Sequence, residues 1–166
     1  ATTTTFASTN EKGQPDVAPE LWINAVMEPL TVAMDEGRLH SAQPGPITDL
    51  GEGWFVPDYV LAKNPDIKTV LDLLERPDLF PAKEDPSKGE FIGCPAGWGC
   101  QLSNINLFRA FKMEDKGWIL TDPGSQAGLD ASMIKAVEKG ENWFGYYWSP
   151  TVPVGKYNMK LVPFGV

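Results

Sequence analysis

The sequence predicts an α/β fold, because segments with helical spacing of apolar residues alternate with short apolar runs bounded by glycine and proline. The 166 residues suffice for one ordinary domain, and 42% of them are hydrophobic. We expect helices over 20–34, 67–74, 101–113 and 125–139. We expect strands over 54–56, 91–92, 142–150 and 158–166.

The N-terminal part begins with threonines, which favour extended structure, before the first expected helix. Pro29 inside that helix predicts a kink or a break, and Gly37 is expected to close the helix. The stretch 41–65 is rich in proline and glycine and is expected to be a loop leading into the strand 54–56. Such a segment suits a crossing between two lobes.

The C-terminal helices carry the clearer signals. The helix over 101–113 is expected to be amphipathic, and its apolar side would comprise Leu102, Ile105, Phe108 and Ala110 or Phe111. The helix over 125–139 is expected to end at Gly140. We interpret Asp122 and Asp130 as helix-start residues.

Composition excludes several classes of function. The net charge of −8 argues against a nucleic-acid partner, which needs clustered lysine and arginine. No apolar run is long enough for a membrane span. Two cysteines and the single histidine, His40, make no convincing metal site, and no cofactor is implied. We find no nucleophile with a base and an orienting partner, so we do not expect an enzyme.

The stretch 93–100 reads GCPAGWGC and holds both cysteines of the chain around one tryptophan. Because its glycines and proline suit neither core nor helix, we interpret it as a loop that ends at a helix N-terminus. The amides of Gly99, Cys100 and Gln101 would then be free to bind an anion. The indole face of Trp98 attracts cations. The loop therefore suits a small zwitterion.

The two cysteines allow two interpretations. A disulfide between Cys94 and Cys100 would order the loop, stabilise the fold by roughly 2 kcal/mol and imply an oxidising compartment. The alternative is a pair of reduced, buried thiols.

Six tryptophans are many for a chain of this length, and some are expected to line a site. Trp148 ends an aromatic strand and Trp22 begins a helical run, so with Trp98 they could box a methylated ammonium. Each desolvated cation–π contact contributes up to about 2 kcal/mol. The alternative for Trp22 and Trp148 is a place in the core. Trp54, Trp118 and Trp143 are interpreted as structural.

Three stretches resemble one known family. GCPAGWGC before a helix, GYYWSPT followed by LVPFGV, and DVAPELW upstream are similar to the glycine betaine-binding family of ABC importer substrate-binding proteins. The first stretch is fairly specific, the others are moderately so, and together they span most of the chain. The resemblance implies a type II periplasmic-binding-protein-like fold, in which two lobes close around the ligand like a hinge.

The resemblance also implies roles for individual residues. Trp98 and Trp148 would wall the ammonium site from one lobe and Trp22 from the other, while the amides of Gly99 and Cys100 would bind the carboxylate. The Cys94–Cys100 pair corresponds to a disulfide present in some members. A histidine that some members carry four residues after the first tryptophan is replaced here by Val26. Asn24 is a conceivable substitute donor.

The resemblance further implies a domain organisation. Full members are longer, so this chain is expected to be part of a larger fold, with partial lobe one over 1–56, lobe two over 57–158 and a return strand over 159–166. The segments 54–58 and about 156–162 would form the hinge. A half-built lobe one could leave a sheet edge open, through which two copies could pair as a homodimer.

The expected function is therefore binding of a small quaternary-ammonium osmolyte, such as glycine betaine, proline betaine or choline, for an ABC importer. Its partners would be the transporter's membrane subunits, and its location periplasmic or extracellular. The alternative is a truncated or repurposed copy that acts as an oligomeric interaction module with no ligand or an altered one.

Overall fold

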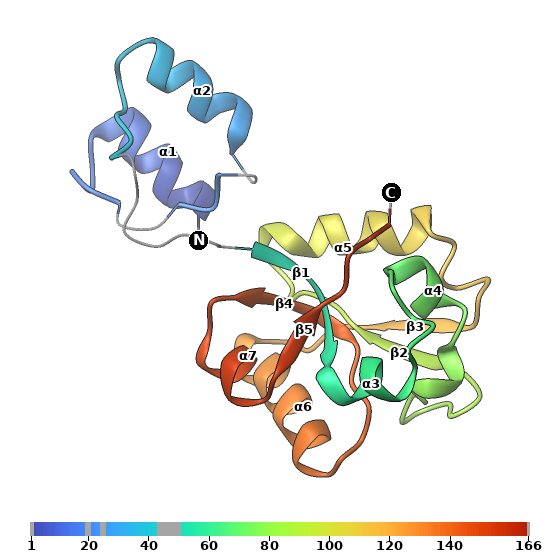
Figure 1. Ribbon diagram of the computed structural model, residues 1–166. Coiled ribbons are helices and arrows are strands. Elements are labelled where there is room, and N and C mark those ends of the chain that lie inside the picture. Colours follow the sequence, from blue (N-terminus) through green and yellow to red (C-terminus); the bar gives the residue numbers. More distant parts are fainter. Residues whose placement is uncertain (1, 19–20, 24–25, 43–50, 166) are drawn as a thin grey trace. The chain divides into compact units, whose positions relative to one another are not determined.

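The computed structural model describes residues 2–18, 21–23, 26–42 and 51–165. The chain divides into two compact units, Ala1–Thr48 and Asp49–Val166. Figure 1 shows helices in the first unit and a sheet with helices on both sides in the second. None of the helices in the described ranges is both long and apolar enough to cross a membrane.

The first unit contains helices α1 (Thr2–Lys12) and α2 (Met27–Asp35). The expectation of extended structure at the threonine run was wrong, because these residues form α1. The Thr9 hydroxyl donates to the Thr5 carbonyl at 2.9 Å, a bond to the preceding turn that threonine can make within a helix. Phe6 is buried, so the burial of an apolar side chain helps to offset the low helix propensity of threonine.

Helix α2 is shorter than the helix expected over 20–34, of which residues 20, 24 and 25 lie outside the described ranges. Pro29 falls in its first turn, where a missing amide hydrogen costs no helical hydrogen bond, so no kink results. Gly37 adopts φ +69° just after the helix and ends it as predicted.

The second unit is built on one five-stranded sheet in the order β3-β2-β4-β1-β5. Its strands are β1 (Gly51–Pro57), β2 (Gly89–Ile92), β3 (Trp118–Thr121), β4 (Gly145–Ser149) and β5 (Met159–Leu161). Strand β2 runs parallel to both β3 and β4, whereas β1 runs antiparallel to β4 and β5. The predicted α/β class is confirmed, although β3 was not expected.

Helices cover both faces of this sheet (Figure 1). They are α3 (Asp58–Lys63), α4 (Val70–Leu74), α5 (Gly99–Ala110), α6 (Gln126–Glu138) and α7 (Val152–Lys156), with a 3-10 turn at Pro77–Leu79. Successive strand residues point to opposite faces, so Trp54 packs with α4 and α5 while Phe55 packs with α6. The second unit therefore has two apolar layers separated by the sheet.

The sequence located α6 well because its ends are encoded locally. The Ser125 hydroxyl accepts a hydrogen bond from the Gly128 amide at 3.1 Å, and Gly140 adopts φ +69° after the last turn. Asp130, however, lies inside α6 rather than at its start. Helix α4 begins at Val70, three residues later than expected, because Thr69 and Asp72 form a capping box there.

Helix α5 departs from its expected apolar side. Leu102 is 66% exposed, whereas Asn104 is only 4% exposed. The helix begins at Gly99 and ends at Ala110, before the expected 113. The reason lies in the hydrogen bonds of Asn104, which satisfy a polar side chain inside the core and turn Leu102 outward.

The expected division into lobes, 1–56, 57–158 and 159–166, stays a prediction. The compact units reflect contacts within one conformation, whereas lobes are defined by the motion between them.

Candidate functional site

The candidate site lies at one edge of the sheet. Because β2, β3 and β4 run in the same direction, their carboxyl ends share this edge. The segments that leave it are the loop 93–98, Thr121–Asp122 and Trp148–Thr151. Ligands of open α/β sheets bind outside the carboxyl ends of the strands, so this edge is where a site is expected.

The loop after β2 is closed by a disulfide between Cys94 and Cys100, whose Cα atoms lie 5.8 Å apart. The disulfide interpretation is thus confirmed over reduced thiols. Gly97 adopts φ +83°, a conformation that favours glycine, and its amide donates to the Gln101 Oε1 at 3.0 Å. The loop is therefore held at both ends and across its middle.

Helix α5 begins directly at this loop, with Trp98 as its N-cap residue and no side-chain cap. The Gln101 amide donates to the Trp98 carbonyl at 3.1 Å. The expectation that this amide is free was therefore wrong. The amides of Gly99 and Cys100 have no hydrogen-bond acceptor among the described residues. Two N–H groups thus remain available at the positive end of the helix dipole.

The indoles of Trp98 and Trp148 lie together, with ring centroids 5.5 Å apart and planes inclined at 64°. Both side chains are half-buried, so neither is sealed in the core. Trp98 belongs to the disulfide loop and Trp148 to the end of β4. The sheet order therefore brings together two of the three predicted wall residues, beside the two available amides.

Two further aromatic residues, Tyr146 and Tyr147, lie beside these tryptophans and were not predicted as site residues. The Tyr147 ring stacks on Trp148 with centroids 4.6 Å apart, and the Tyr146 ring lies 6.3 Å from it. The run YYW was visible in the sequence, but a strand alternates its side chains, so it gave no reason to expect both tyrosines near Trp148.

Each of these tyrosines donates its hydroxyl proton to a carboxylate. Tyr146 donates to Glu52 and Tyr147 to Asp130, each at 2.6 Å. Burial, followed by the hydrogen-bonded carboxylate, raises the pKa of both tyrosines above 10.0. Both tyrosines are therefore protonated near neutral pH and remain hydrogen-bond donors to these carboxylates.

The tryptophans interpreted as structural are buried as predicted. Trp54, Trp118 and Trp143 are 1%, 2% and 4% exposed. Each indole N–H finds an acceptor: the Asn104 side chain at 2.7 Å, the Leu74 carbonyl at 2.9 Å and the Ser132 hydroxyl at 3.0 Å, respectively. They stabilise the fold and offer no open ring face to a ligand.

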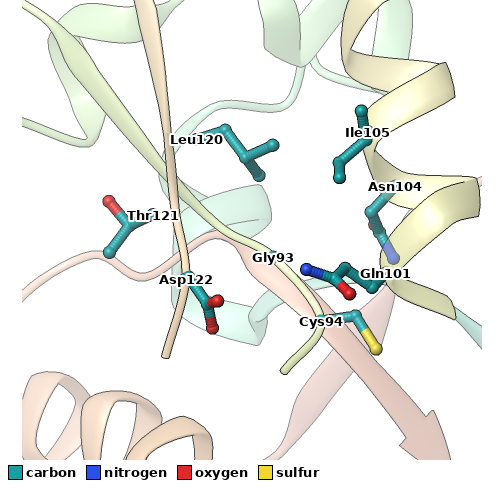
Figure 2. A pocket seen from close by; sticks show the side chains of 8 residues that line it. All are labelled: Gly93, Cys94, Gln101, Asn104, Ile105, Leu120, Thr121 and Asp122. Carbon is teal, nitrogen blue, oxygen red and sulfur yellow. The ribbon is translucent and has the colours of Figure 1, made fainter. Parts of the chain in front are cut away.

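A small pocket of about 140 Å³ lies behind the disulfide loop, between α5 and the end of β3 (Figure 2). Figure 2 shows the Gln101 side chain extending from α5 toward Gly93 and Asp122. The residues that line the pocket include none of the tryptophans. Within the described ranges, no cluster of histidine, cysteine, aspartate or glutamate could hold a metal ion.

Asn104 forms the wall between this pocket and the core. Its Nδ2 donates to the Cys100 carbonyl at 2.8 Å, and its Oδ1 accepts from the Trp54 indole at 2.7 Å. One buried side chain thus joins the start of α5 to strand β1. This role of Asn104 was not predicted, because an asparagine inside a helix normally faces solvent.

The remaining predicted site residues lie in the first unit. Trp22 is half-buried there and stays a predicted third wall, while Asn24 lies outside the described residues. Val26, where some members have histidine, is buried. His40 is exposed.

Solved structures with the same fold include three transporter binding proteins. The glycine betaine/L-proline-binding protein of Borrelia burgdorferi aligns with a TM-score of 0.57 and 21% identity, over 70% of this chain and 38% of its own. A choline binding protein in complex with choline aligns with a TM-score of 0.56 and 16% identity, over 70% and 37% of the two chains. An unliganded, semi-closed choline binding protein gives a TM-score of 0.60 and 15% identity, over 99% and 53%.

The chain thus spans between 37% and 53% of the length of these structures. At such identities the likeness establishes the fold alone. No curated protein sequence matches the chain. The profile of the OpuAC family, the substrate binding domain of ABC-type glycine betaine transport systems, matches residues 1–163. The match covers both the disulfide loop and the aromatic strand, and the chain belongs to this family.

Proposed function

We propose that this chain binds a small quaternary-ammonium ligand, such as glycine betaine, proline betaine or choline, for an ABC importer. The observation that carries the proposal is the pair of half-buried indoles, Trp98 and Trp148, 5.5 Å apart beside two available helix amides. Membership of the OpuAC family supports it. So does the same fold in a choline binding protein in complex with choline.

The two halves of the proposed site bind different parts of the ligand. The methylammonium head lies against the indole faces of Trp98 and Trp148, which attract a cation and also bury its methyl groups. The amides of Gly99 and Cys100 bind the carboxylate of a zwitterionic ligand, and the disulfide holds them in place. Trp22 is the proposed third wall and Asn24 a proposed further donor.

The ligand's binding energy is used to close two lobes, and the membrane subunits of the transporter recognise the closed form. The proposed hinge contains β1 and β5, which pair antiparallel from Phe55–Leu161 to Pro57–Met159. The disulfide is consistent with a periplasmic or extracellular location. Pairing of two copies through a sheet edge stays a prediction without support.

Isothermal titration calorimetry against glycine betaine, proline betaine, choline and carnitine tests the proposal. We expect binding by at least one of the first three ligands, and a loss of affinity of about tenfold or more in Trp98→Ala, because one cation–π contact is removed. Leu102→Ala is the control, since Leu102 is an exposed neighbour on α5 without an aromatic ring.

Melting temperatures of both variants show whether they are folded. Absence of binding by the folded wild-type chain would contradict the proposal and favour an interaction module instead. So would equal affinities of wild type and a folded Trp98→Ala.

A further inference from the structure

The aromatic half of the candidate site is connected to two carboxylates from different elements. Glu52 lies on β1, directly opposite Trp148 in the strand register. Asp130 lies inside α6. Each accepts a short hydrogen bond from a tyrosine whose ring contacts Trp148. Both carboxylates are therefore linked to the same indole through a tyrosine.

Within the described ranges, neither of these two carboxylates forms an ion pair with a lysine or arginine. The ion pairs found in the described part of the chain join Arg38 to Glu36, Arg76 to Asp78, Lys116 to Glu75 and Lys139 to Glu141. None of them includes Glu52 or Asp130. Glu52 is exposed and Asp130 half-buried, so water and salt screen the charge of Glu52 more strongly than that of Asp130.

The tyrosines hold these charges in place. A phenol that donates to a carboxylate fixes the position of that carboxylate and makes its own ring richer in electrons, since the O–H bond is polarised. Because burial raises the pKa of both tyrosines, each keeps its proton near neutral pH and remains a donor to its carboxylate. The two carboxylates thus create a negative field at the hydroxyl ends of the rings that contact Trp148, the tryptophan that we place against the ammonium group.

Such a field acts on the net charge of a ligand. Choline carries one positive charge, whereas glycine betaine is neutral overall, because its carboxylate balances its ammonium group. The attraction of the ammonium head by Glu52 and Asp130 is therefore partly cancelled in a zwitterion by repulsion of its tail.

We propose that Glu52 and Asp130, held by Tyr146 and Tyr147 beside Trp148, are specificity-determining residues that raise the affinity for cationic methylammonium ligands relative to zwitterionic ones. This inference rests on the proposed function, because it needs a methylammonium ligand at Trp148. The amides of Gly99 and Cys100 act in the opposite direction by binding the tail of a zwitterion. The relative strength of the two carboxylates and the two amides sets the preference for a cationic or a zwitterionic ligand.

The test compares the dissociation constants of choline and glycine betaine in Glu52→Gln, Asp130→Asn and the double variant. Both changes remove a charge and keep a side-chain oxygen that can accept from the tyrosine. We expect choline binding to weaken roughly threefold for each charge removed, and glycine betaine binding to weaken less. The ratio of the two constants thus shifts toward glycine betaine, and the shift shrinks as salt is added.

Glu138→Gln is the matched control. Glu138 also lies on α6 and accepts from a tyrosine, Tyr157 at 3.2 Å. The ring contacts of Trp148, however, are with Trp98, Tyr146 and Tyr147. We expect this variant to leave the ratio unchanged, although it removes the same charge from the same helix.

An unchanged ratio in folded variants of Glu52 and Asp130 overturns the inference, as does an equal shift in Glu138→Gln, which would make the effect one of overall charge. If the double variant unfolds at a low temperature, the ratio of the two dissociation constants is compared in the single variants. A wild-type chain that binds neither ligand contradicts the proposed function itself. A chain that binds with an unaltered ratio contradicts only this inference.

Discussion

Two aromatic clusters in this protein use the same kinds of ring in different surroundings. The core cluster contains Trp54, Phe91, Trp118 and Phe144, all at most 2% exposed, with ring centroids of Trp54 and Phe91 4.4 Å apart. The site cluster contains Trp98, Tyr146, Tyr147 and Trp148, and both of its tryptophans are half-buried.

The clusters differ most clearly in their polar atoms. The indole nitrogens of Trp54 and Trp118 each donate to an acceptor in the protein. The site tryptophans have no such acceptor among the described residues, while the site tyrosines donate to carboxylates. Fully buried rings with satisfied nitrogens stabilise the fold, whereas half-buried rings beside negative charge are suited to bind a cation.

Removing a ring from each cluster should have opposite consequences. Trp54→Ala is expected to lower the free energy of unfolding by about 3–5 kcal/mol, because it leaves a cavity and a buried Asn104 oxygen without its donor. Trp98→Ala should cost about 1 kcal/mol or less, since its site is partly open. Denaturant unfolding measures both changes, and equal losses would remove the distinction between the clusters.

Asn104 joins Trp54 of the core cluster to the start of α5 beside the site, so its removal should affect both stability and binding. Asn104→Ala is expected to cost about 1–3 kcal/mol, because the buried Trp54 N–H loses its acceptor. Ligand affinity should fall as well, since the Cys100 carbonyl at the start of α5 is released.

Asn106→Ala, at an exposed position of the same helix, is the control for both measurements. If the two variants unfolded at the same denaturant concentration, the bridging role of Asn104 would be disproved.

The smallest expected effect concerns high pH and the site tyrosines. Their pKa values are raised in the folded chain, so above pH 10.0 the unfolded chain releases these protons first. Stability from the two tyrosines is therefore fully present below pH 10.0 and is lost as the pH rises toward their folded pKa values. The melting temperature should therefore fall as the pH is raised above 10.0.

A Tyr146→Phe, Tyr147→Phe double variant should show a smaller fall above pH 10.0, because it has no phenol to titrate at these positions. A fall of the same size in the variant would assign the pH effect to other groups, such as lysines.

Local features of the chain were predictable. The disulfide loop, the half-buried Trp98 between glycines and the capped helix α6 each depend on residues within a few positions of one another. The structural role of Trp54, Trp118 and Trp143 was also correct. Contacts between distant segments were harder to foresee: Tyr146 and Glu52 are separated by 94 positions, and Trp54 and Asn104 by 50.

The order of residues was enough to predict the α/β class and the loop GCPAGWGC, because turns, caps and a short disulfide ring are encoded by neighbouring residues. Burial of Asn104 and the hydrogen bonds of two carboxylates to tyrosines beside Trp148 followed only from the folded chain. Those contacts require the strand order β3-β2-β4-β1-β5, which no local preference encodes, because it arises from packing the whole sheet between its two layers of helices.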